Sequence, residues 1–190
     1  MKESADHVRF AFGRLAVQYY VEGRFAARHV GLPTCGNLLH HAVEMALKAC
    51  LAERVDLPTI KKYRHSLPKL YAAAFQLAPA LGATFFAETI ARLHEFESIR
   101  YPDKHLTEGG GMIAALFPPH PGETWGPLQG PPAPQYVLIL QDVDSLFCEA
   151  FRGANLNPAA FLAPLRDEAR RYLCEHNPES AFLTVCPPTA

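Results

Sequence analysis

Residues 35–54 most constrain the fold, because this stretch carries apolar side chains on two sides of a helix. One stripe consists of Leu38, Ala42, Met45, Ala49 and Ala52. A second stripe, on the far side, consists of Val43, Leu47, Cys50 and Leu51. A helix that is apolar on two sides must be covered by neighbouring elements on both of them. The sequence therefore predicts a central helix surrounded by other helices.

Further segments show the helical spacing that such neighbours require. They are 4–31, 66–80, 83–100, 136–151 and 159–176. We expect an all-α fold, in which a four-helix up-and-down bundle is followed by two C-terminal helices. Residues 55–58 predict a turn, residues 112–117 a short strand or a segment packed on the bundle, and residues 182–185 a short terminal strand.

The stretch from residue 101 to residue 135 has no helical pattern and is rich in glycine and proline. A segment of this length is long for a compact domain, so we expect either a functional flap or a mobile insertion. The chain is predicted to be one domain over residues 1–190. Its parts are a helical core (1–105), the loop insertion (101–135) and C-terminal helices that pack on the core (136–190).

Charge and composition narrow the function classes. The net charge of −1 gives no overall basic field, so any contact with RNA must be local. No segment has the ~18 uninterrupted apolar residues of a membrane span, and the N-terminus lacks an apolar signal core. The five cysteines form no Cys-x2-Cys pair. We expect buried, reduced thiols in a cytoplasmic protein, with a nucleophilic cysteine as the alternative.

Histidine is abundant, but its spacing does not indicate a metal site. His40 and His41 are neighbours, and we expect their side chains to point to different faces of the helix. No His-x3-His occurs among the nine histidines. His65 precedes a predicted helix, where it is expected to be a local hydrogen-bonding group. We therefore predict no metal and no cofactor.

Charged residues continue the apolar stripe of the helix predicted over 83–100. That stripe consists of Phe86, Ile90 and Leu93. At about 100° per residue the same face carries Glu97 and Arg100. Charges rarely point inward unless they are paired or used. Pro102 then ends the helix, and His105 completes the pattern Arg100-x4-His105.

These residues resemble motifs of the HEPN family, helical domains named for nucleotide binding in higher eukaryotes and prokaryotes. Arg100-x4-His105 is similar to the Arg-x(4–6)-His ribonuclease motif, and Arg100–Asp103 is similar to the RYPD ending of another branch. Residues 37–51 resemble the Glu-x3-Lys-Ala helix, and residues 62–70 resemble the His-x-Leu-x-x-Leu helix start. The resemblance covers about residues 5–105 and implies a HEPN-type four-helix bundle.

The resemblance implies an RNA- or nucleotide-directed protein, a metal-independent endoribonuclease of a toxin-antitoxin or defence type. Arg100 would stabilise the negative charge of the reacting phosphate, and His105 would act as base or acid. A homodimer would bring two such motifs together across a two-fold axis. Glu97, three residues before Arg100, would orient the guanidinium.

The helix predicted over 35–54 is expected to contribute to the same region. Glu44 and Lys48 form an i,i+4 pair, and His41 lies beside them. These residues either support Arg100, or Glu44 and Lys48 form a helix-surface ion pair worth roughly 0.3–0.5 kcal/mol. We favour the surface ion pair.

A second interpretation follows from two departures from the catalytic pattern. Tyr101 stands where catalytic HEPN members have a polar residue, and Pro102 interrupts the helix between arginine and histidine. The RYPD branch implies a non-catalytic binding module that partners a nucleotidyltransferase, or a dimeric scaffold. In that case Arg100 pairs with Glu97 and caps the helix, and His105 is an exposed loop residue.

Overall fold

A computed structural model describes residues 4–29, 34–82, 85–97, 112–116, 135–163 and 165–184. Its helices are α1 (Ala5–His29), α2 (Thr34–Ala52), α3 (Leu57–Lys62), α4 (Leu67–Leu77), the 3-10 turn η1 (Pro79–Leu81), α5 (Ala87–Glu95), α7 (Leu140–Gly153), α8 (Ala159–Leu162), α9 (Asp167–Cys174) and α10 (Ser180–Thr184). Two short strands, β1 (Met112–Leu116) and β2 (Gln135–Ile139), pair in parallel. The predicted all-α class is confirmed, with this strand pair as an addition.

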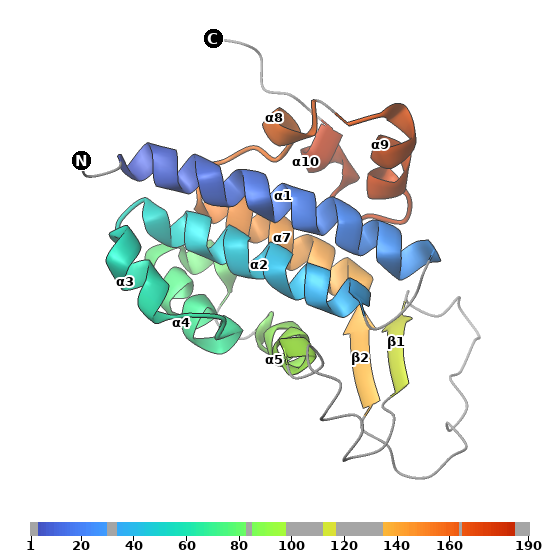
Figure 1. Cartoon of the computed structure of the whole chain (residues 1–190), viewed down its shortest axis with the longest axis horizontal. Coiled ribbons are helices and arrows are strands. Elements are labelled where there is room, and N and C mark those ends of the chain that lie inside the picture. Colours follow the sequence, from blue (N-terminus) through green and yellow to red (C-terminus); the bar gives the residue numbers. More distant parts are fainter. Residues whose placement is uncertain are drawn as a thin grey trace.

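Helix α2 lies at the centre of the fold (Figure 1). It packs against α1 along its length and also contacts α4, α5 and α7. Leu39, Val43 and Leu47 are fully buried in these contacts. The prediction of a central helix is therefore confirmed, and its physical origin is the apolar surface on both sides of the helix.

The C-terminal helices pack on α1 and α2. Helix α7 packs on α2, whereas α8 and α9 contact α1 and lie above it in Figure 1. Within the described residues, no helix is long and apolar enough to cross a membrane.

A buried ion pair connects α1 to α7. The guanidinium of Arg24 and the carboxylate of Asp144 are both completely buried and in contact. The hydroxyl of Tyr20 donates to Asp144 at 2.7 Å, and the Asn177 amide donates to that hydroxyl at 2.9 Å. Arg24 also donates to the carbonyl of Glu175 at 2.8 Å. These bonds tie α1, α7 and the segment between α9 and α10 together.

Several predicted boundaries are wrong. The helix predicted over 136–151 begins only at Leu140, because the preceding residues pair with β1 and are rich in aromatic and β-branched types that favour strands. The helix predicted over 159–176 is instead two helices, α8 and α9, and Arg166 between them has an extended backbone.

Three smaller predictions also need correction. The strand predicted over 182–185 is instead part of α10, whose Thr184 hydroxyl bonds back to the carbonyl of Ser180. The turn predicted over 55–58 is shorter, because α3 already begins at Leu57 behind the N-cap Asp56. The helix predicted over 66–80 ends at Leu77 and continues only as η1.

The start of α2 depends on a glycine. A Cβ on Gly36 would lie 1.8 Å from a ring carbon of Phe96, which is itself fully buried. We predict that Gly36→Ala lowers the free energy of unfolding by about 1–3 kcal/mol, because the ring must move within a packed core. Urea unfolding measures this loss. The exposed Gln18→Ala on α1 is the control, and an unchanged midpoint for Gly36→Ala would contradict the close packing.

The Arg24–Asp144 pair allows a second stability test. Arg24→Met leaves a buried carboxylate without its partner, so we expect a loss of about 3–5 kcal/mol. The double variant Arg24→Met/Asp144→Leu should lose less, because neither charge remains. Urea unfolding compares the two, with the exposed Arg14→Met as the control. A double variant less stable than the single one would show that the pair is not a coupled unit.

Candidate active site

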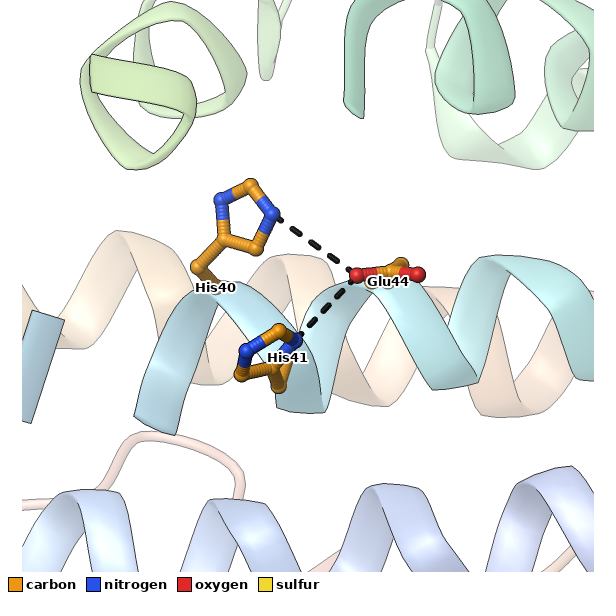
Figure 2. Close-up of side chains that lie close together, drawn as sticks. All are labelled: His40, His41 and Glu44. Atoms are coloured by element: carbon orange, nitrogen blue, oxygen red, sulfur yellow. Dashed lines mark hydrogen bonds and ion pairs between the residues drawn. The ribbon is translucent and has the colours of Figure 1, made fainter. Parts of the chain in front are cut away.

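The candidate site is a group of charged and titratable side chains around Glu44, which we call the Glu44 cluster. It consists of His40, His41, Glu44, Lys48, His65 and Glu97. Four of these residues come from α2, and the other two follow α3 and α5 in the chain. Figure 2 shows His40, His41 and Glu44 on α2, with both imidazoles directed at the carboxylate.

The carboxylate of Glu44 is completely buried and receives donors on both oxygens. Lys48 Nζ lies 2.5 Å from Oε1, and His41 Nδ1 lies 3.2 Å from Oε2. His65 Nδ1 lies 3.1 Å from Oε2. Burial raises the pKa of Glu44, but the bonds from His41 and Lys48 outweigh it and hold the pKa at about 2.

The predicted surface ion pair between Glu44 and Lys48 is therefore wrong. Both residues are buried, with 0% and 8% of their surface exposed. The reason is the central position of α2, which buries the side of the helix that carries Glu44 and Lys48. A buried charge is stable only when it is paired, so this pair is part of the core rather than of the surface.

His40 is the innermost histidine of the cluster. Its Nδ1 lies 2.9 Å from the carbonyl oxygen of Leu93, so Nδ1 carries a proton and donates it. Its Nε2 lies 3.2 Å from Glu97 Oε2 and 3.7 Å from Glu44 Oε2. Burial lowers the pKa of His40. The side chain of His40 thus connects the Glu44 carboxylate to α5 and to Glu97, which lies just beyond the end of α5.

The prediction that His40 and His41 point to different faces of the helix is wrong. Their ring planes are nearly perpendicular, at an interplanar angle of 84°. Nevertheless both reach Glu44, because residues three and four positions earlier on a helix lie on the same side as the later residue.

One end of the cluster is open to solvent. The side chain of His65 is 52% exposed and that of Glu97 is 28% exposed, whereas Glu44 and His40 are enclosed. The bond from His65 Nδ1 to Glu44 leaves Nε2 on a half-exposed ring. A histidine held by a carboxylate in this way can take up or release a proton at its other nitrogen.

The sequence-predicted residues fall into two groups. Glu44, Lys48, His41 and Glu97 are brought together in this cluster, the last of them through His40. The predicted catalytic residues Arg100 and His105, with Tyr101, lie outside the described residues. Most of the 101–135 insertion also lies outside them.

Sequence reasoning missed the roles of His40 and His65. His65 is not a local group, because its partner Glu44 is on another helix. One sequence feature could have indicated the role of His40. It lies four residues before Glu44 on a helix predicted to be central, where buried polar side chains need partners.

Three of the four described cysteines offer no competing nucleophile, and the fourth, Cys174, is partly exposed. Cys35, Cys50 and Cys148 are buried and unpaired in disulfides, as predicted for structural thiols. Burial raises the pKa of Cys35 and of Cys50 to about 11. These thiols are therefore protonated at neutral pH and are poor nucleophiles.

Comparison of the chain with protein-family models, with curated proteins and with solved structures gave no match. The HEPN resemblance thus remains a prediction from sequence motifs.

The pKa of Glu44 has a consequence for acid stability. Because its folded-state pKa is about 2 and its ordinary value is 4.5, the carboxylate stabilises the fold above pH ~4.5 and loses this contribution as pH falls toward 2. Glu44→Gln should be less stable at pH 7, with a gap to the wild type that narrows by roughly 3 kcal/mol over this pH range. Urea unfolding at a series of pH values measures the gap. The exposed Glu22→Gln is the control, and a pH-independent gap for Glu44→Gln would contradict the assignment.

Proposed function

We propose that this chain is an RNA- or nucleotide-directed protein of the HEPN type that cleaves RNA without a metal ion. The observation that supports this proposal is that the helix of residues 37–51 and Glu97 meet. Glu97, which precedes Arg100 by three residues, lies 3.2 Å from His40 beside the buried carboxylate of Glu44. The half-exposed His65 is held by the same carboxylate.

The proposed reaction needs few groups. A base removes the proton from the 2′-hydroxyl, whose oxygen attacks the phosphorus and expels the 5′-oxygen, which takes up a proton from an acid. The products are a 2′,3′-cyclic phosphate and a 5′-hydroxyl. Arg100 would stabilise the charge on the phosphate oxygens through its planar fork, which Lys cannot replace. His105 and the Glu44-held His65 would supply base and acid, with a homodimer bringing a second set.

A non-catalytic binding module is the second candidate, and one observation favours it. The amine of Lys48 is buried and bonded to Glu44, so its positive charge is engaged inside the protein. A cluster whose donors are all used internally would hold α2, α4 and α5 together. The chain would then bind a nucleotide or a nucleotidyltransferase partner through other residues.

RNA cleavage by the purified chain in EDTA tests the proposal. We expect cleavage to persist and to leave cyclic phosphate ends. Arg100→Ala, His105→Ala and His65→Gln should each lower the rate by about 10²–10⁴-fold, as expected for lost acid–base or charge stabilisation. The exposed His7→Gln is a matched control and should cleave at the wild-type rate.

Two results would favour the binding module instead. One is the absence of cleavage by the wild type across varied RNAs, and the other is an unaltered rate in His105→Ala. If Arg100 is only structural, Arg100→Ala should lower thermal stability and His105→Ala should change nothing. A strictly monomeric chain by light scattering would remove the contribution of a second set of residues.

A further inference from the structure

The Nε2 atom of His40 is buried and has no hydrogen-bond partner among the described residues. The bond from Nδ1 to the Leu93 carbonyl places the proton of the neutral ring on Nδ1. The lone pair of Nε2 then faces the carboxylate oxygens of Glu97 and Glu44 at 3.2 Å and 3.7 Å. Three electron-rich atoms in a buried place repel each other unless a cation lies among them.

The spacing of these atoms suits a metal ion. One ligand atom from each of His40, His41 and Glu44 lies within 4.8 Å of the other two. His41 Nδ1 is 3.2 Å from the same Glu44 oxygen that faces His40. Bonds of 2.0–2.2 Å in a tetrahedral zinc site put ligand atoms roughly 3.3–3.6 Å apart. The observed separations therefore need little rearrangement.

We propose that His40 Nε2, His41 Nδ1 and Glu44 Oε2 bind one divalent transition-metal ion of the zinc class, with the fourth position left to water. Two imidazoles with one carboxylate suit zinc, cobalt or nickel, whereas magnesium and calcium prefer ligand sets made only of oxygen. The Leu93 carbonyl is the kind of outer partner that orients a ligating histidine.

Two adjustments accompany binding. The proton of His41 moves from Nδ1 to Nε2, so that Nδ1 can donate its lone pair to the metal. Lys48 keeps its bond to the other oxygen of Glu44, Oε1, and the carboxylate thus bridges the lysine and the ion. The ion would bind Glu44 Oε2, the same oxygen that His65 Nδ1 contacts. The ion therefore has no role in the metal-independent cleavage proposed above, and the metal site does not rest on that cleavage.

Direct metal titration tests the inference without RNA. The full chain is stripped with EDTA, dialysed and titrated with Co²⁺, whose visible d–d absorption is more intense in a tetrahedral site than in an octahedral one. We expect saturation at one ion per chain, displacement by Zn²⁺ and no competition from Mg²⁺. Zn²⁺ should also raise the melting temperature, because it binds only the folded state.

Variants locate the ion. Loss of an outer-shell partner lowers metal affinity by about 10–100-fold. We expect a larger loss of Co²⁺ affinity for each of His40→Gln, His41→Ala and Glu44→Gln. The exposed His29→Gln should bind as the wild type does. His41→Ala decides the matter if the others fail to fold by circular dichroism, since its side chain is 19% exposed. Absence of saturable binding, or undiminished binding by His41→Ala, would overturn the site.

Discussion

The burial of most of the surface of α2 is the constraint on which the rest of the structure depends. Because α2 contacts α1, α4, α5 and α7, most of its surface is buried, and its buried charged residues need partners inside the protein. Glu44 accepts hydrogen bonds from Lys48, His41 and His65, and His40 donates to the Leu93 carbonyl. The polar contacts that hold the start of α4 and the end of α5 against α2 follow directly from this requirement.

The two buried charge groups differ in one decisive respect. Arg24 and Asp144 are both fully buried. Tyr20, which donates to Asp144, stacks on Phe147 with ring centroids 4.0 Å apart. No titratable side chain of this pair reaches solvent, so we assign it to stability. The Glu44 cluster instead reaches solvent at His65 and Glu97, and it alone of the two can exchange protons, ions or ligands with the surroundings.

Periodicity predicted the long helices well because their burial is encoded in local spacing. The helices expected over 4–31 and 35–54 correspond to α1 and α2 with small shifts at their ends. Prediction failed where a partner distant in the chain decided the outcome. The residues before Leu140 have strand-favouring side chains, but they form β2 only because β1, more than 15 residues earlier in the chain, lies beside them.

The candidate site shows the same division. The sequence alone determined that α2 is central and that Glu44 and Lys48 are neighbours on it, since both depend only on helical repeat. The helix predicted over 83–100 is shorter, because α5 ends at Glu95, before Glu97. Tertiary structure decided that Glu44, Lys48 and Glu97 meet, with His40 and His65 as the connecting groups. The physical reason is that Glu44 loses water and gains its donors only when the neighbouring helices pack around it. Burial then raises its pKa, and the bonds from His41 and Lys48 lower the pKa by more than burial raises it.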